Sequence, residues 1–458
     1  MGKFISLGKI NKYFIYILLS VIFLIFNKVL YGYNHNGSFE EVKLFKDDAF
    51  SDHILIHYIF SYFGTFLLGI LFYKIQIYKN KSSNANSKVN NKRSSSEIEL
   101  IFNKNDLNYN SDNLYLHILL TIFLWVLEEH LIDIYSKVLK DLDFWMIELI
   151  IISYINNKFF KIKLYAHQRF VFYLNIIPCI FKIVTIILSF VKNRNENIDK
   201  ILYTEHPFYL FGIIFYFILI TLRSYVNTKI KWLMDLKYIS IAKLIIIYGI
   251  IGTIISSIIC TITTFVNCSS SNESTKNIGL CKVELNTTND NNNITLYYYD
   301  NFSIYFNKFD GIKIIEEIVI IILGFVTFFF NKYYSLLIIK YLTPVYIIFS
   351  FPMFFLFKKI ILIFNTLIIE NSFFKKTKSE PYNNTKFILD ISGDIIAIIG
   401  FLIYLEIIVL NFWNLDYNVK QNIIKRGIEE TENFIIKYND DEEEEEGKIE
   451  LNENKTTD

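Results

Sequence analysis

Long apolar blocks constrain this chain more than any other feature of its sequence. Blocks of roughly 18–25 apolar residues recur along it, and a helix of that length crosses the hydrocarbon layer of a membrane. A soluble chain would carry shorter apolar stripes, each confined to one helix face. The sequence therefore predicts an all-α, polytopic membrane protein. The ten predicted spans are 13–32, 53–77, 114–137, 142–159, 168–191, 207–226, 240–263, 312–331, 344–368 and 387–410.

The region 333–370 admits either one span or two. It contains Pro344 and Pro352, and proline favours helix starts and kinks. We expect a turn at Lys340–Thr343 and a single ninth span that begins at Pro344. Two short spans in this region would raise the total to eleven.

The short loops that follow even-numbered spans are basic, and they predict the orientation of the chain. By the positive-inside rule these loops face the cytosol, which also places both termini there. The basic stretches are 74–93, 158–163, 223–232 and 331–334.

N-glycosylation sequons fall almost entirely in the loops predicted on the opposite side. Segment 80–97, on the basic side, has one despite its Asn and Ser content, Asn80 in Asn80-Lys81-Ser82, and this sequon and Asn454 in the C-terminal tail are the two that break the pattern. This partition predicts a glycoprotein in an endomembrane or in the plasma membrane. The predicted glycosylation sites are Asn36, Asn267, Asn272, Asn286, Asn293, Asn301 and Asn383.

These assignments divide the chain into parts. The tail is acidic and poor in apolar residues, so we expect it to be disordered, with a protein partner for its acidic run as the alternative. The parts are a cytosolic N-terminus at 1–12, the first half of the bundle with the sixth span at 13–226, the remaining spans at 240–410, and the cytosolic tail at 411–458.

Cysteine usage agrees with this topology. The extracytosolic loop 264–311 contains Cys268 and Cys281, and disulfides persist in such compartments, so we expect a disulfide between them. Cys179 and Cys260 lie inside spans, where they act as small apolar side chains. No CxxC or Cys/His ligand spacing occurs, so the sequence predicts neither a metal nor a cofactor.

Three segments resemble the drug/metabolite transporter superfamily, and most of all its nucleotide-sugar-transporter-like branch. They are IIISYINNKFFKIKLYAHQRFVFYLNIIP, with Gln168 opening a helix, RSYVNTKIKWLMDLKYIS ahead of Gly249 and Gly252, and KYLTPVYIIFSFPMFFLF. The resemblance implies a transporter made of two five-span halves. Because five is odd, the halves would have opposite orientation, as in inverted-repeat transporters. It implies no particular substrate residue.

Charged side chains interrupt several predicted spans. A charge at the bilayer centre costs about 2.5–3.5 kcal/mol, so such groups face the bundle interior or a wet cavity. Lys182 and Glu148 lie at similar depth in adjacent spans and are predicted to form a buried pair. The alternative is that these charges only fix helix register or reach the headgroups. The substrate-binding candidates are Lys182, Glu148, Glu128 and Asn175, and the proton or ion candidates are Glu129, His130 and Asp133.

We expect a secondary carrier that moves a small polar or anionic solute, such as a nucleotide sugar or another metabolite, by alternating access. The alternative is a non-transporting, receptor-like or scaffolding multi-pass protein. No phosphate-binding GxxxxGK[ST] loop occurs, so ATP drive is not expected. No catalytic constellation occurs either, and a net charge of +1 gives no attraction to nucleic acid. We therefore expect neither an enzyme nor a nucleic-acid partner, but a lipid bilayer and a small solute.

Overall fold

A computed structural model of the chain describes most of its apolar blocks and part of the loop 264–311. The described residues are 5–7, 14–30, 53–87, 111–138, 145–160, 164–195, 199–235, 237–268, 283–289, 292–307, 312–369, 381–413, 415–417 and 422. The predicted acidic run of the tail lies outside these ranges.

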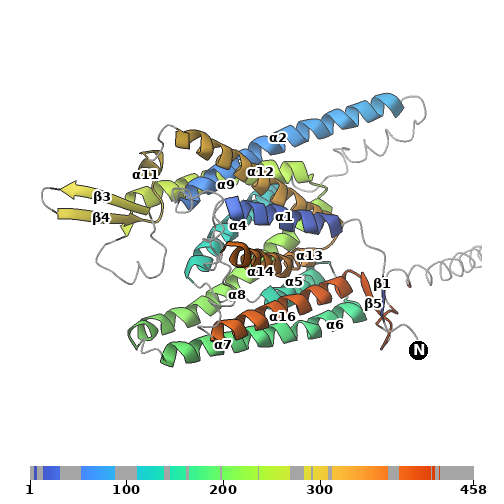
Figure 1. The fold of residues 1–458 in the computed structure, drawn as a ribbon. Coiled ribbons are helices and arrows are strands. Elements are labelled where there is room, and N and C mark those ends of the chain that lie inside the picture. The colour runs from blue at the N-terminus through green and yellow to red at the C-terminus, as the bar shows by residue number, and fades with distance from the viewer. Residues whose placement is uncertain are drawn as a thin grey trace, which may run out of the picture. The chain divides into compact units, whose positions relative to one another are not determined.

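Each of the ten predicted spans coincides largely with helix (Figure 1). The fifth and ninth spans are each made of two consecutive helices, and one further short helix, α11, precedes the eighth span. The helices are α1 (Phe14–Leu30), α2 (Ile54–Ser87), α4 (Ser111–Val138), α5 (Trp145–Phe160), α6 (Ala166–Leu174), α7 (Ile176–Asn195), α8 (Asp199–Asp235), α9 (Ile241–Phe265), α11 (Phe302–Asn307), α12 (Ile312–Tyr341), α13 (Val345–Ile348), α14 (Ser350–Ile369) and α16 (Pro381–Tyr404).

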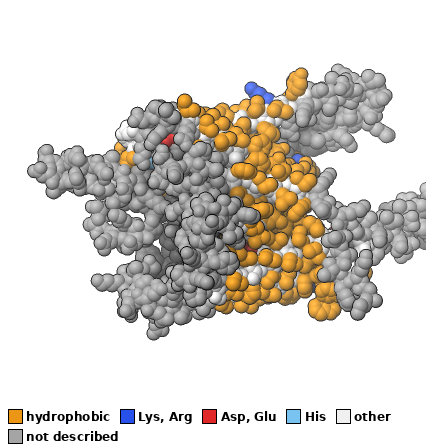
Figure 2. All heavy atoms as spheres, in the orientation of Figure 1, with side chains coloured by type: hydrophobic (Ala, Val, Ile, Leu, Met, Phe, Trp, Pro, Cys, Tyr) orange, Lys and Arg blue, Asp and Glu red, His pale blue; other side chains and the backbone are white. Residues whose placement is uncertain are grey.

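Six of the described helical segments are long and apolar enough to cross a membrane. On α9, Ile254, Ile258 and Ile262 are exposed at four-residue spacing and form one apolar face. Figure 2 shows hydrophobic side chains over much of the described surface in that view. The chain is thus a helical, multi-pass integral membrane protein. The six segments are Leu55–Ile75, Leu114–Ile132, Ala166–Thr185, Ile241–Phe265, Glu317–Tyr341 and Phe387–Tyr404.

Helices α8 and α12 run beyond their predicted spans. The predicted loop 74–93 is likewise helical as far as Ser87, the end of α2. The stretches 223–232 and 331–334 of α8 and α12 are helical, so their prediction as loops is wrong, whereas nothing tests the prediction that they face the cytosol. The reason is that nothing stops either helix: neither 213–235 nor 325–341 contains a proline or a glycine.

The turn predicted near Lys340–Thr343 is present. Helix α12 ends at Tyr341, and Pro344 precedes α13. The break between α13 and α14 has a local cause, because Pro352 has no N–H to donate to the carbonyl of Ile348. The region 333–370 therefore contains the end of α12 and one interrupted helical segment.

Helix α16 ends earlier than the predicted span 387–410. Glu406 adopts a left-handed φ of 60°. Its N–H donates to the carbonyl of Ile403 (3.0 Å), and the N–H of Ile407 donates to that of Leu402 (2.9 Å). This is a Schellman cap, which closes the helix and reverses the chain. The next residues form strand β5 (Ile408–Leu410) instead of helix.

The chain divides into two compact units, which are described separately. The smaller unit comprises 1–11, 163–176 and 396–458. In it, β1 (Ile5–Leu7) pairs antiparallel with β5, and Ser6 lies opposite Val409. The larger unit comprises 12–162 and 177–395 and contains most of the helices.

Glycines allow α2 and α9 to pack closely in the larger unit. A Cβ atom added at Gly249 would lie 2.6 Å from the backbone nitrogen of Phe66, and one at Gly252 would meet the ring of Tyr62. Without side chains at these positions the two backbones approach each other, which is how small residues act in membrane helix pairs.

Polar side chains join α1 to α12. The Asn27 amide donates to the carbonyl of Gly324 (3.2 Å) and to the hydroxyl of Thr327 (3.3 Å). The Asn331 amide donates to the carbonyl of Ser20 (3.1 Å). Such bonds supply attraction between helices where lipid removes the hydrophobic driving force.

Part of the loop 264–311 is a folded sheet. Strands β2 (Asn267–Cys268), β3 (Val283–Asn289) and β4 (Asn292–Tyr298) are antiparallel, in the order β2-β4-β3. Cys268 lies in β2, but Cys281 is outside the described residues, so the predicted disulfide stays a prediction.

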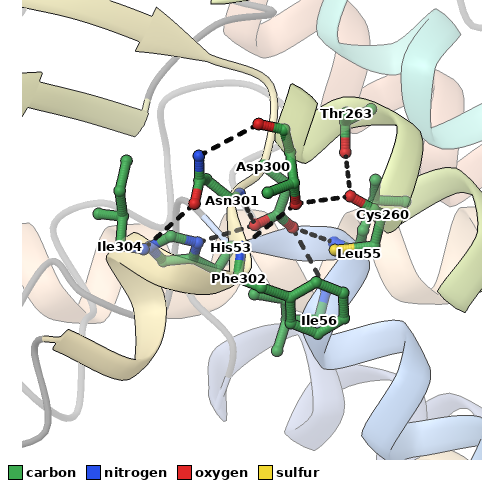
Figure 3. A network of polar contacts seen from close by, with 10 residues as sticks. His53, Leu55, Ile56, Cys260, Thr263, Asp300, Asn301, Phe302 and Ile304 are labelled. Atoms are coloured by element: carbon green, nitrogen blue, oxygen red, sulfur yellow. Dashed lines mark hydrogen bonds and ion pairs between the residues drawn. The ribbon is translucent and has the colours of Figure 1, made fainter. Parts of the chain in front are cut away.

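Asp300 attaches this loop to the start of α2 (Figure 3). One carboxylate oxygen accepts the backbone N–H groups of Leu55 (2.7 Å) and Ile56 (3.3 Å). The other oxygen lies 2.8 Å from Nδ1 of His53, and both side chains are fully buried. Asp300 therefore caps α2 from a distant part of the sequence, since a carboxylate satisfies the first N–H groups of a helix.

The same network includes one predicted glycosylation site, Asn301. The side chain of Asn301 is buried, its oxygen accepts the N–H of Ile304 (3.2 Å), and its amide nitrogen points to the carbonyl of Thr264 (3.5 Å). Glycosylation of Asn301 stays a prediction. Asn36 and Asn272 lie outside the described residues, and nothing tests the remaining sites.

Candidate functional site

The charged segment of α4 points to two different neighbours. Glu128 and Glu129 are consecutive, so their side chains leave the helix about 100° apart. Glu128 faces α8, whereas Glu129 faces α2, α9 and α12. Two charge clusters result, joined through one turn of α4.

Arg223 is the centre of the first cluster. Its Nε donates to Glu128 (2.7 Å) and its Nη1 to Glu148 (3.1 Å), so two carboxylates share one guanidinium. The guanidinium also lies over the ring of Phe351, 5.1 Å from the ring centroid. Arg223 thereby joins α8 to α4, α5 and α14 by charge-assisted contacts.

The predicted pair of Glu148 with Lys182 is wrong, because Glu148 pairs with Arg223. Arg223 had been assigned to a cytosolic loop, but the extension of α8 carries it into the bundle. Lys182 lies on α7 near Asp394, which forms an ion pair with Lys359 of α14 (2.6 Å). Lys182 thus belongs to a separate charge cluster of α7, α14 and α16.

Glu129 is the centre of the second α4 cluster. The hydroxyls of Tyr62 (2.8 Å) and Tyr248 (2.5 Å) both donate to the same carboxylate oxygen. The other oxygen pairs with the ammonium of Lys332. All four residues lie within candidate membrane spans.

Three aromatic rings surround the ammonium of Lys332. Its nitrogen lies 5.3 Å from the ring centroid of Phe328, 5.6 Å from that of Trp125 and 5.7 Å from that of Tyr248. Each of these distances is within the range of a cation–π contact. We call Glu129, Tyr62, Tyr248, Trp125 and Phe328 the Glu129 cage; Lys332 occupies it.

The other predicted candidates lie at different places. His130 is buried, with Nε2 2.9 Å from the hydroxyl of Ser256. Asp133 is on α4, but its side chain is not described. Asn175 lies in the smaller unit and donates to the carbonyl of Val171 (2.9 Å), which is a bond within one helical turn.

Sequence reasoning missed the partners of the α4 acids. Lys332, like Arg223, was assigned to a basic loop, and no pattern singled out Tyr62, Tyr248 or Trp125. The usable signal was the absence of any helix-stopping residue after the sixth and eighth apolar blocks.

A comparison with known families finds no family model that matches this chain, and no curated protein matches its sequence. Within the residues that the structure describes, no group of three His, Cys, Asp or Glu side chains could hold a metal ion. The two α4 clusters contain three carboxylates, two cations and several aromatic rings.

Proposed function

We propose that this chain is a secondary carrier that moves a small charged or polar solute by alternating access between two inverted five-helix halves. The first half is α1, α2, α4, α5 and α6–α7, and the second is α8, α9, α12, α13–α14 and α16. The observation that carries the proposal is the way these helices pair.

Much of the helix pairing repeats when each helix is exchanged for the one five spans away, although α12 also packs on α8, α9 and α13 while the equivalent contacts of α4 with α1, α2 and α5 are less extensive. The packed pair α1–α12 corresponds to the packed pair α8–α4, and α2–α12 corresponds to α9–α4. The packed pair α5–α8 corresponds to the contact of α14, in the ninth span, with α1. The pairs α2–α9 and α5–α13 map onto themselves and are packed as well. Two halves with the same neighbours are expected of internal repeats.

Helix directions support inversion of the second half. Along α2 and α9, Tyr62 meets Gly252 and Phe66 meets Gly249, so these two equivalent helices run antiparallel. Equivalent helices in repeats of the same orientation would run parallel. An odd number of crossings in each half gives the antiparallel arrangement.

Helices of the same parity run parallel, as alternate crossings require. Gly64 of α2 meets Phe325 of α12, and the rings of Phe72 and Tyr333 are in tilted contact with their centroids 5.5 Å apart. Both residue numbers increase together, so the second and eighth spans share a direction. This supports a crossing of the membrane by each intervening span.

The charge clusters bridge the two halves. Glu128, Glu129 and Glu148 belong to the first half, whereas their partners Arg223 and Lys332 belong to the second. Ion pairs between halves can break and form again as the halves rock, and a solute can take the place of one partner. Intramembrane charges at the repeat interface are typical of solute and proton pathways.

The test is solute counterflow in liposomes that contain the purified chain, with labelled nucleotide sugars, nucleotides, amino acids and amines. We expect saturable exchange for one class, and we expect Glu148→Gln to slow it by about tenfold or more, because the pair with Arg223 loses its charge. The control is Asp235→Asn, at the partly exposed end of α8, the helix that carries Arg223. This variant should exchange solute at the wild-type rate. Absence of saturable exchange in every class would overturn the proposal.

A further inference from the structure

The Glu129 cage has the composition of a site for an organic cation. Its carboxylate is fixed by two phenol hydroxyls, and its rings face the bound ammonium of Lys332 at 5.3–5.7 Å. Aromatic rings around a cation, combined with a carboxylate, are how proteins recognise alkylammonium groups. Here the group in the cage is the protein's own side chain.

The cage also lies where the proposed halves meet. Tyr62 and Tyr248 come from α2 and α9, which are equivalent helices, and donate to one oxygen of Glu129. Glu129 and Lys332 come from α4 and α12, which are equivalent as well. A site to which both halves contribute equally can open first to one side of the membrane and then to the other as the halves rock.

Charge favours a cation over an anion at this place. Among the five charged side chains of the two α4 clusters, the three carboxylates outnumber the two cations. An anionic solute would meet an excess of like charge, and the desolvation of the bundle interior makes that repulsion costly. This argues for a cationic solute in place of the anionic one expected from the sequence.

Exposure separates the cage from the neighbouring carboxylates. The side chains of Lys332 and Glu129 are 17% and 12% exposed, whereas those of Glu128 and Glu148 are 5% and 1% exposed. The cations differ little, since Arg223 is 20% exposed, but the carboxylate in the cage is more accessible to a solute than the other two. The long, flexible stem of a lysine can also withdraw.

We propose that the Glu129 cage is an ammonium-binding site and that Lys332 is a tethered ligand, which a small amine cation displaces. The consequence of this binding rests on the proposed carrier function. Displacement of Lys332 removes the ion pair between α4 and α12, which frees one half to move against the other.

Binding of n-butylammonium, which copies the lysine side chain, tests the site. The full chain is purified in detergent and titrated by calorimetry. We expect Lys332→Gln to bind n-butylammonium about tenfold or more tightly than the wild type, because a competing ligand is gone. Glu129→Gln should abolish binding. Lys359→Gln, which removes a lysine paired to Asp394 outside the cage, should bind as the wild type does.

A second pair of variants keeps the ion pair intact and tests the rings alone. Phe328→Leu removes one ring of the cage, and we expect it to weaken n-butylammonium binding to the protein several-fold. Phe325→Leu, on the same helix but packed against Gly64, is its control and should leave binding unchanged. Equal binding by Phe328→Leu and Phe325→Leu, or no gain in Lys332→Gln, would overturn the site.

The outcomes for site and carrier can be told apart. Binding of n-butylammonium without saturable exchange in any solute class would overturn the carrier and leave the site. Saturable exchange of anionic solutes by a chain that binds no amine would overturn the site and leave the carrier.

Discussion

At the residue scale, Arg223 is the side chain whose loss should destabilise the protein most. Arg223→Leu leaves Glu128 and Glu148 buried without the guanidinium they share, and loss of one partner from a buried ion pair costs about 3–5 kcal/mol. We expect a clear drop in the melting temperature of the purified protein, measured by thermal unfolding in detergent.

The control for Arg223→Leu is Lys229→Leu on the same helix. The Lys229 ammonium lies over the rings of Trp232 (4.7 Å) and Phe159 (5.3 Å). Loss of such partly exposed contacts costs about 1 kcal/mol or less. Adding Glu128→Gln and Glu148→Gln to Arg223→Leu should recover part of the lost stability. Equal melting of the two single variants would contradict this role for Arg223.

The sequence revealed the acids of this site but not their partners. Glu128, Glu129 and His130 interrupt an apolar block, and the cost of burying charge made them candidates. Arg223 and Lys332 follow apolar blocks, where a rise in polarity marks the end of a span but not the end of the helix. A hydropathy pattern reports contact with lipid, and these two cations contact protein instead.

At the element scale, the α2–α9 pair depends on backbone contact. A Cβ atom at Gly249 would lie 2.6 Å from a backbone nitrogen, which cannot rotate away, whereas one at Gly69 would lie 3.1 Å from a side-chain carbon of Ile246. We expect Gly249→Ala to cost about 1–3 kcal/mol and Gly69→Ala less. Melting temperature and the yield of monodisperse protein measure both, and a reversed order would refute the packing argument.

The elements themselves were largely predictable, and their ends were not. Ten apolar blocks predicted ten helical segments, because the need to satisfy every backbone group in lipid leaves helix as the local solution. The cap at Glu406 was not predictable, since its left-handed conformation arises without the usual glycine. The sheet in the loop 264–311 was also missed, because polar Asn-rich strands lack the apolar alternation that marks a half-buried strand.

At the scale of the whole molecule, the pairing of β1 with β5 bears on the number of crossings. Strands pair only on the same side of a membrane, so we predict an even number of crossings between β1 and β5. Ser6 and Val409 lie opposite each other, and opposite residues in antiparallel strands lie within disulfide range. In a cysteine-free background we expect Ser6→Cys and Val409→Cys to cross-link on oxidation, seen as a shift in gel mobility.

The control for this cross-link combines Ser6→Cys with Tyr417→Cys, an exposed position beyond the strand. It should not cross-link. If neither pair of cysteines reacts, or both react equally, then β1 and β5 are not neighbours and the even count loses its support. The sequence predicts ten spans but does not show which helices touch, because helix pairing depends on small and polar side chains that an average hydropathy does not report.

The β1–β5 pair also sets an order for biosynthesis. A ribosome makes β1 before α1 and β5 only after α16, so β1 waits for its partner while the intervening helices are synthesised. During that time its edge is open to other strands. Closure of the smaller unit is therefore a late step, and a chain whose synthesis stops before Ile408 would leave an edge that another molecule or a chaperone can take up.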